Sequence, residues 1–593
     1  MILGFRKEMM MTMKKYMLFI LSGLLTTSCI DTVVLPDDIT IGEDMWKSKS
    51  DVEGMVNGVY KAMTSEAIIE RCIVWGSYRS DEMNPIVQTF NYGKENALKD
   101  IKSGYMTQTN TYADWSAFYG VINRCNLVLQ HAPAVVESDP AYTEATLNTD
   151  ISQMLAMRSL CYFYLVRAFR DVPVTPGAYK FSSQEFEIPQ EAPLTVLNKC
   201  IEDLETAIKT PLSPQGFTDW RRVGYMNKEG IAALLADVYL WRGSMTHNTA
   251  DYQKCVEYCD VVLASKKQAT ADAFGGFERP WPNLVYVGES NYFQQFVRGN
   301  SLESIFELQM DGKNDDNFGL RNCYWNYDEK SRGNGLMRAS LIFNEVAADK
   351  VYTSANDYRW YESCCAVNSS DKEELDIFKM VSMTSTGNTE GNLKAQPSII
   401  RDYVDVAQNW IFYRLSDVML MKAEALVQLA PDSDEATEQD DQSALRGAFS
   451  LVSEVNKRAL ALATLTDADT LKYSSYANKE AMEELVLAER LRELCFEGKR
   501  YFDLLRYNYR HVDGIQPDKI LADISEDPDV MVENNGAMMN FMTRGMSVGG
   551  DAAKLLMHTE PYLYFPVLES ELKANLLLKQ NPAYIKSNLY EKN

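Results

Sequence analysis

The sequence of 593 residues has few histidines, and none of them lies close to another. Its four histidines are far apart in the chain, and its eleven cysteines form no Cys-x-x-Cys pair. Structural and catalytic zinc sites take several histidine or cysteine ligands, usually at short spacing. We therefore expect neither a histidine-based zinc site nor a cofactor that such ligands would hold.

Basic residues are also scarce relative to acidic ones. The chain has 59 Lys and Arg against 83 Asp and Glu, a net charge of -24. A charge of this sign repels phosphate backbones and anionic headgroups. Nucleic acid is therefore excluded as an expected partner, while 46% hydrophobic and 24% charged residues indicate an ordinary globular protein.

The sequence lacks an apolar run long enough to cross a membrane, and the run near its start is short. Lys14 and Lys15 precede about ten apolar residues, roughly half of what a spanning helix needs. Small residues then lead to Cys29, so the stretch resembles a bacterial lipoprotein signal. We expect 1–28 to be removed and Cys29 to carry lipid such as palmitate. A signal peptide in which Cys29 is incidental stays an alternative.

What the sequence does contain is helical periodicity. Apolar residues recur at i, i+3, i+4 and i+7, whereas alternating strand patterns are few. We expect a mainly α fold of stacked helical pairs, of the tetratricopeptide kind, with long irregular loop insertions. Helices are predicted at 50–64, 112–131, 149–170, 193–209, 227–243, 249–265, 411–430, 444–463 and 478–507.

This periodicity divides the mature chain, which we expect to be a single domain over 29–593. The helical scaffold lies mainly in 50–265 and 410–507. A loop-rich block rich in Gly, Asn, Asp and aromatic residues occupies about 266–400, and an irregular C-terminal block occupies about 511–593. Loops this long on a helical scaffold usually carry a function.

The segment "ERLRELCFEGKRYFDLLRYN" (Glu489 to Asn508) is the strongest motif. It predicts an apolar helix face with ion pairs between Glu497 and Arg500 and between Asp503 and Arg506. Gly498 permits a close backbone approach or a bend. Glu493 and Glu497 lie one turn apart on one helix, so they are poorly placed to flank a sugar from opposite sides as glycosidase carboxylates do.

Five blocks carry a family resemblance. They are Glu489–Asn508, Tyr413–Leu426, Ile122–Leu129, Ala156–Val174 and Tyr562–Tyr584. With the lipoprotein-like start, they resemble the SusD/RagB family of Bacteroidetes outer-membrane lipoproteins. The resemblance implies a non-enzymatic protein, lipid-anchored on the outer face of the outer membrane. It also implies that the protein acts as a lid over a SusC-like TonB-dependent transporter in a starch-utilization-type system.

For the ligand, the resemblance implies an oligosaccharide or polysaccharide or, in RagB-like members, an oligopeptide. Sugar capture needs exposed aromatic platforms beside polar side chains. The loop block offers Trp325, Tyr292, Tyr324, Trp281 and Tyr327, and a second cluster after the first helix offers Trp75, Tyr78, Arg79 and Asp81. We expect these residues to include the glycan-binding site. A glycoside hydrolase or peptidase is the remote alternative.

One acidic turn could bind calcium. The stretch "DGKNDDNFG" gathers oxygen donors at Asp311, Asp315 and Asp316, but it lacks the spacing and closing Glu of an EF-hand. A plain acidic turn is the alternative. Among the cysteines, the adjacent Cys364 and Cys365 leave open a disulfide with each other or with Cys323.

Overall fold

The structure is a computed structural model of the whole chain. It describes residues 45–86, 92–179, 187–273, 293–312, 316–324, 335–344, 347, 350–354, 357, 359–365, 375–380, 382–385, 397–400, 408–431, 438–460, 470–524, 536–546 and 550–585. The described residues all belong to one compact unit, Ile41–Asn593. The signal segment and Cys29 lie outside the described residues, so removal and lipidation stay predictions.

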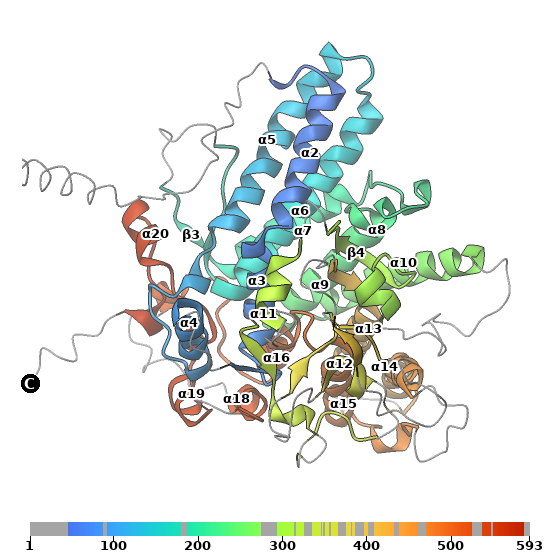
Figure 1. The fold of residues 1–593 in the computed structure, drawn as a ribbon, viewed down its shortest axis with the longest axis vertical. Coiled ribbons are helices and arrows are strands. Elements are labelled where there is room, and N and C mark those ends of the chain that lie inside the picture. Colours follow the sequence, from blue (N-terminus) through green and yellow to red (C-terminus); the bar gives the residue numbers. More distant parts are fainter. Residues whose placement is uncertain are drawn as a thin grey trace, which may run out of the picture. The chain divides into compact units, whose positions relative to one another are not determined.

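The scaffold consists of long helices that pack in pairs (Figure 1). Helix α5 packs on α6, α6 on α7, α9 on α10, α10 on α13, and α13 on α14, and α2 lies beside α5. This confirms the predicted mainly α class with stacked helical pairs. The long helices are α2 (Lys49–Met63), α5 (Ser116–Ser138), α6 (Glu144–Phe169), α7 (Pro193–Ala207), α9 (Lys228–Thr246), α10 (Thr249–Ala273), α13 (Leu415–Leu429), α14 (Glu438–Ala459), α15 (Lys479–Leu494) and α16 (Arg500–Arg510).

Side-chain caps fix where several of these helices begin. Thr143 accepts a hydrogen bond from the Thr146 backbone N–H at the start of α6. Asn227 accepts from two backbone N–H groups at the start of α9, and Asn478 accepts from Ala481 at the start of α15. Each cap satisfies donors that the helix itself leaves without a partner. Polar residues just before apolar periodic runs therefore set the register of the scaffold.

Shorter elements connect and cover the scaffold. The structure places a helix, α3, directly after α2, and a second, α4, before the predicted 112–131 helix. The remaining helices are α3 (Glu66–Ile73), α4 (Tyr92–Ser103), α8 (Arg221–Gly224), α11 (Phe318–Tyr324), α12 (Arg359–Ser363), α17 (Leu521–Ile524), α18 (Gly536–Met542), α19 (Gly550–Leu556) and α20 (Glu569–Ala574). Segments η2 (Val74–Tyr78) and η5 (Phe293–Arg298) are π-helical.

The strands form two-stranded antiparallel pairs rather than a continuous sheet. Pair β4 and β10 joins the loop block to the second half of the scaffold, with Trp410 opposite Leu308. The pairs are β1 (Met83–Pro85) with β5 (Met337–Ala339), β4 (Ser304–Leu308) with β10 (Trp410–Arg414), β2 (Val172–Pro173) with β3 (Gln190–Glu191), β6 (Cys364–Cys365) with β7 (Asp376–Ile377), and β8 (Ser382–Ser385) with β9 (Pro397–Ile400).

Two predicted helices contain a strand or an interruption in the structure. The predicted helix 411–430 begins as strand β10 and becomes helical only at Leu415, because residues 410–414 hydrogen bond to β4. The predicted helix 478–507 is interrupted between α15 and α16, where Phe496 (φ 65°) and Gly498 (φ 72°) are left-handed. A helix cannot continue through such residues.

The interruption brings two glycines into close contact. A Cβ added to Gly76 would collide with the Gly498 carbonyl oxygen, and one added to Gly498 would lie 2.7 Å from the Cys72 carbonyl oxygen. The Gly498 N–H donates to Ser77 Oγ over 3.0 Å. The predicted close backbone approach at Gly498 is confirmed, and it joins α16 to the π-helical turn η2.

The cysteines whose side chains the structure describes are buried. Cys323 is a free thiol, so the disulfide considered between Cys323 and the adjacent cysteine pair does not form in the structure. Within the described ranges, no helix combines the length and apolar character that crossing a membrane requires.

Candidate functional site

The predicted aromatic residues of the early segment lie in the core. Trp75 and Tyr78 belong to η2 and are fully buried. The Trp75 indole stacks on Phe118 with ring centroids 5.0 Å apart and donates to the Tyr112 carbonyl over 2.8 Å. Tyr78 Oη donates to the Leu98 carbonyl over 3.2 Å. Neither ring is open to a ligand, because η2 packs between α4, α5 and α16.

Arg79 also has a structural role. Its guanidinium donates to the carbonyls of Leu563 and Tyr562 over 2.6 and 2.8 Å. The same group lies 4.7 Å from the ring centroid of Tyr501 and 5.0 Å from that of Phe565. Arg79 therefore ties the early segment to α16 and to the C-terminal block, and it is buried there.

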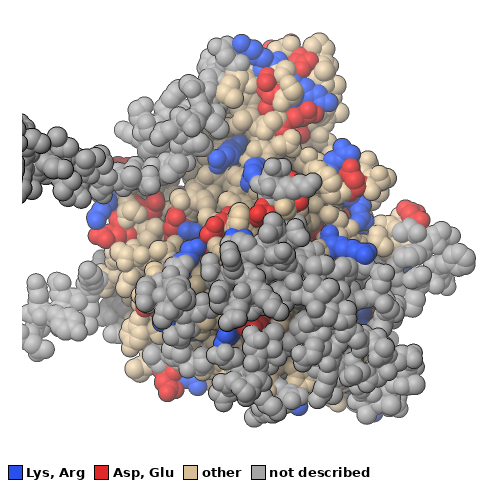
Figure 2. All heavy atoms as spheres, in the orientation of Figure 1, with Lys and Arg blue, Asp and Glu red and all other residues tan. Residues whose placement is uncertain are grey.

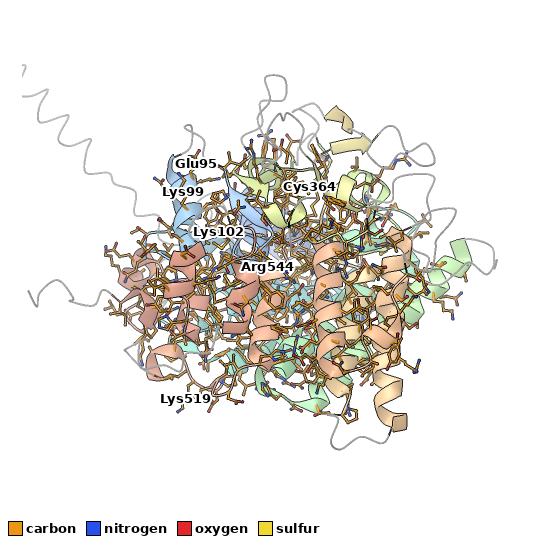
Figure 3. All side chains as sticks on the ribbon, turned by 90° about the horizontal axis from the view of Figure 1, so that it is seen from below. Glu95, Lys99, Lys102, Cys364, Lys519 and Arg544 are labelled. Carbon is orange, nitrogen blue, oxygen red and sulfur yellow. The ribbon has the colours of Figure 1, made fainter. Side chains whose placement is uncertain are left out.

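Asp81 is buried between two arginines. Arg500 donates to it from Nε over 2.9 Å and from Nη2 over 3.1 Å. Arg544, which belongs to the C-terminal block, also donates to it. Burial raises the pKa of Asp81, but Arg500 and Arg544 outweigh it and hold the pKa at about 2. Figure 3 labels Arg544 and Lys102, and Lys102 donates to the carbonyls of Tyr78 and Ser80 on the same segment.

Two further buried groups beside Asp81 have shifted pKa values. Burial raises the pKa of Glu82 to about 8 and lowers the pKa of Lys102 to about 7. Both shifts have the same cause, because burial disfavours the charged form of each group. The predicted cluster from Trp75 to Asp81 is therefore part of the scaffold.

Of the predicted loop-block residues, Tyr324 is described and buried. It ends α11, and its Oη donates to the Phe496 carbonyl over 2.8 Å. Its ring packs in the interior with a centroid 6.4 Å from that of Phe496. Tyr324 thus anchors α11 and does not present its ring to a ligand. Trp325, Tyr292, Trp281 and Tyr327 lie outside the described residues, so their role stays a prediction.

The structure brings the loop block to the early segment at another place. Helix α11 packs on α3, so closely that a Cβ on Gly319 would lie 2.9 Å from Ile69 Cβ. Asn322 of α11 donates to Glu66 over 2.9 Å and to Glu70 over 3.1 Å, both on α3. We call the surface formed by Glu66, Glu70, Lys94, Phe318, Arg321 and Asn322 the α3–α11 surface.

This surface combines an exposed aromatic ring with polar groups of both signs. Phe318 is 39% exposed, and the Arg321 guanidinium lies 4.3 Å from its ring centroid. Lys94 of α4 binds Glu66 over 3.1 Å and Glu70 over 2.8 Å. An apolar face beside Asn, Arg and carboxylate groups is the chemistry that sugar recognition uses.

The carboxylates of the surface differ in burial. The Glu66 side chain is 46% exposed and the Glu70 side chain only 4% exposed. Burial raises the pKa of Glu70, and the Lys94 charge and hydrogen bonds oppose that shift. Burial likewise lowers the pKa of Lys94, but Glu70 and Glu66 outweigh it and raise the pKa overall. Of these three groups, Glu66 and Lys94 are therefore the ones that a ligand can reach.

The predicted calcium turn is described in part. Asp315 lies outside the described residues. Asp311 is exposed and Asp316 half-buried, while Asn317 caps α11 by accepting from the Leu320 N–H over 3.0 Å. In the part of the chain that the structure describes, no group of three or more His, Cys, Asp or Glu side chains could hold a metal ion. Calcium binding stays a prediction.

The carboxylates of the strongest motif are buried in ion pairs. Glu493 is bound by Arg359 over 3.0 Å, by Arg414 over 2.6 Å and by Arg458. Burial would raise the pKa of Glu493, but the three arginines hold it well below the usual range. A carboxylate held ionised and shielded in this way cannot donate a proton to a substrate. We call Glu493 and these three arginines the Glu493 cluster.

Of the two ion pairs predicted for this motif, one forms in the structure and the other does not. Arg506 does pair with Asp503 over 2.7 Å. Glu497 instead binds Arg414 over 2.7 Å and Lys379 over 2.6 Å, while Arg500 binds Asp81. The predicted pair of Glu497 with Arg500 is wrong, because the chain turns away at Gly498 before Arg500 begins α16.

Sequence reasoning missed several residues of the α3–α11 surface. Phe318, Glu66 and Lys94 were not candidates, because no motif marks them and Glu66 lies in a helix that periodicity did not reveal. A useful signal was the glycine after Phe318 in "NFGLRN", since a small residue there permits close packing of the short helix.

The fold defines a class of protein: a scaffold of paired helices that carries irregular insertions. A model of the SusD family matches residues 308–584. SusD-like protein P38 of Formosa agariphila is 22% identical over 85% of this chain and 94% of its own length. SusD-like protein P2 of the same organism is 24% identical over 83% of this chain and 91% of its own length.

Solved structures agree with this fold. A SusD homolog from Bacteroides thetaiotaomicron superposes with a TM-score of 0.64 at 17% identity, covering 91% of this chain and 98% of its own. NanU of B. fragilis gives 0.61 at 18% identity, covering 93% and 100%. These matches support the resemblance to the SusD/RagB family that the sequence blocks carry. Proteins of this family bind nutrients and are associated with the outer membrane.

Proposed function

We propose that this protein captures oligosaccharide or polysaccharide at the cell surface and passes it to a SusC-like TonB-dependent transporter, over which it acts as a lid. Lipid on Cys29 would hold it on the exterior of the outer membrane. The proposed role is binding, without catalysis. Confinement next to the transporter makes weak contacts with several sugar rings effective, because it raises the local concentration of the bound chain.

The α3–α11 surface is the observation that carries this proposal. It places an exposed ring, Phe318, beside side chains that donate and accept hydrogen bonds. Sugar rings present C–H faces and hydroxyls, so a ring stacked on Phe318 could exchange hydrogen bonds with Asn322 and Glu66. These side chains come from α3, α4 and α11, which gives the surface a rigid base.

The remaining predicted loop residues are proposed to extend this surface. Trp325 directly follows the last residue of α11, seven positions after Phe318 in the sequence. The buried Tyr324 is held by its hydrogen bond to the Phe496 carbonyl, immediately before Trp325 in the sequence. We propose that Trp325, with Tyr292, Trp281 and Tyr327, supplies further aromatic contacts to the glycan.

An oligopeptide is the second candidate ligand. The α3–α11 surface carries both a reachable carboxylate, Glu66, and reachable cations, Lys94 and Arg321. Groups of both signs match the two charged termini of a short peptide. Neutral glycans remain the first choice, because Glu66 and Lys94 already pair with each other.

Binding measurements test the proposal. We expect the full chain in mild detergent to bind members of a panel of purified glycans more tightly than a panel of oligopeptides. Trp325→Ala and Phe318→Ala should each weaken glycan binding about threefold to tenfold, the value of one aromatic contact. Leu555→Ala is the matched control, because Leu555 is 74% exposed on α19 and lies outside the proposed site.

Each outcome decides one part of the proposal. Unchanged affinity in both aromatic variants would remove the site assignment. Peptide binding without glycan binding would favour the second candidate, and release of cleaved products would favour an enzyme. For the partner, the tagged protein should bring down a large outer-membrane β-barrel in mild detergent, and its recovery alone at several detergent strengths would count against the lid.

A further inference from the structure

A second aromatic surface lies away from the predicted site, just before α9. It is formed by residues 217–225, between the turn η4 (Pro214–Gly216) and the end of α8. Of the tryptophans that the structure describes, only Trp220 is exposed, at 44%. Large aromatic side chains are normally buried or half-buried. An indole left open to solvent therefore calls for an explanation.

The Trp220 ring is held in a fixed position. A Cβ added to Gly224 would lie 2.7 Å from Trp220 Cε3, so the indole rests directly on the backbone of α8. Tyr225 supports it with ring centroids 5.5 Å apart, and Tyr225 in turn contacts the buried Tyr60 at 5.1 Å. The surface is thus a rigid platform rooted in the core, and binding would cost little ordering of side chains.

An ion pair between Arg221 and Asp219 lies next to Trp220 in the sequence. Arg221 donates to both oxygens of Asp219, from Nε over 3.0 Å and from Nη2 over 2.8 Å. Its guanidinium lies 5.0 Å from the ring centroid of Phe217. Both charged side chains are exposed, at 47% and 43%. Tyr225 Oη donates to Asn57 of α2 over 3.2 Å, which adds an amide at the edge.

The charge of this surface points to an uncharged ligand. Asp219 and Arg221 neutralise each other, so the pair attracts neither anions nor cations strongly. A sugar hydroxyl both donates and accepts, so neighbouring hydroxyls can bind the carboxylate and the guanidinium together. On the face shown in Figure 2, the described Lys and Arg atoms are interspersed with Asp and Glu atoms.

We propose that the surface of Phe217, Asp219, Trp220, Arg221 and Tyr225 binds a neutral hexopyranose ring of the captured glycan, as a second contact separate from the α3–α11 surface. The ring stacks on Trp220, and its hydroxyls bond to Asp219, Arg221 and the Asn57 amide. The inference rests on the proposed function for its ligand class. A second contact on the same protein lengthens residence on a long polysaccharide through avidity.

Affinity electrophoresis of the full chain tests this site. Native gels contain amylopectin, laminarin, xyloglucan or galactomannan, and retardation against a gel without polysaccharide gives the affinity. In the gel that retards the wild type most, Trp220→Ala should bind about threefold to tenfold more weakly. Trp220→Phe should keep most of the affinity, because it retains an aromatic face. Tyr105→Ala, which removes a 58% exposed ring elsewhere, should match the wild type.

The outcomes separate this inference from the proposed function. Equal retardation of the wild type and Trp220→Ala would overturn the second contact and leave glycan capture standing, with Phe318→Ala as the variant that still loses affinity. No retardation of the wild type in any gel would overturn both. If Trp220→Ala changes only which proteins co-purify with the chain, the platform is a protein contact and the inference fails. Thermal unfolding of each variant confirms that it folds.

Discussion

The Glu493 cluster and the α3–α11 surface use the same residue types for opposite purposes. In the cluster, Glu493 is fully buried and three arginines neutralise it. On the surface, Glu66 is close to half exposed and one lysine, itself partly exposed, approaches it. Residue type alone therefore does not separate structure from binding. Burial and the number of partners do.

The difference follows from the cost of removing charges from water. A buried carboxylate is tolerated only when partners satisfy it, so Glu493 depends on its three arginines, each of which also binds another carboxylate. An exposed pair contributes little to stability because water screens it. Its side chains can therefore change partners when a ligand arrives. The variants below test this contrast, beginning with the largest expected effect.

Glu493→Gln should strongly destabilise the protein. The change leaves Arg359, Arg414 and Arg458 without their shared carboxylate, and breaking a buried pair costs about 3–5 kcal/mol. Urea unfolding followed by circular dichroism measures the free energy of unfolding. Glu484→Gln is the control, since Glu484 is exposed on the same helix and its loss should cost less than about 0.5 kcal/mol. Similar costs for both variants would contradict the contrast.

Lowering the pH should decrease the free energy of unfolding, because protonation of the buried Asp81 removes its ion pairs with Arg500 and Arg544. Asp81 has a folded-state pKa of about 2 against an ordinary 3.8. Its stabilisation is therefore complete above pH 3.8 and is lost as the pH falls toward 2, by about 2 kcal/mol from this residue. Unfolding free energies between pH 5 and pH 2.5 measure the loss, which should be shallower in Asp81→Asn. A constant free energy over this range would contradict the assignment.

Glu66→Gln should have the smallest effect on stability and a clear effect on binding. Its charge is exposed and shared with Lys94, so the free energy of unfolding should change by less than about 0.5 kcal/mol. Glycan affinity should fall, because an amide accepts hydrogen bonds more weakly than a carboxylate. Isothermal titration and urea unfolding on the same preparation measure the two effects. A large loss of stability with unchanged affinity would place Glu66 with the structural charges.

Much of the scaffold could be predicted from the sequence. Apolar periodicity located α2, α5, α6, α7, α9 and α10 within a few residues of their ends, except where α5, α6 and α10 extend further. This works because a helix that buries one face repeats its apolar residues regardless of its partners. The glycine at 498 also marked the close approach correctly, since a position without a side chain in a long motif has few other uses.

The candidate site was harder to predict because exposure depends on distant segments. In the sequence, Trp75 and Tyr78 follow a helix and lie among polar residues, a pattern that also fits aromatic residues exposed in a binding loop. In the structure, Trp75 packs on Phe118 and Tyr78 bonds to Leu98, so both are buried. Trp220 was not a candidate, although it is the exposed tryptophan of the described residues. Nothing local distinguishes the two cases. The difference comes from which helix happens to pack over the ring, and periodicity within a segment does not contain that information.

The crossing of Gly76 and Gly498 has a consequence for how the chain acquires its structure. The hydrogen bond between the Gly498 N–H and Ser77 joins positions 421 residues apart. The interior around η2 therefore stays incomplete until residues from both ends of this span are available to fold, and contacts of such long range slow folding. In a chain that ends before position 498, the apolar residues of η2 would lack part of their packing, so such truncated chains should be cleaved readily by proteases.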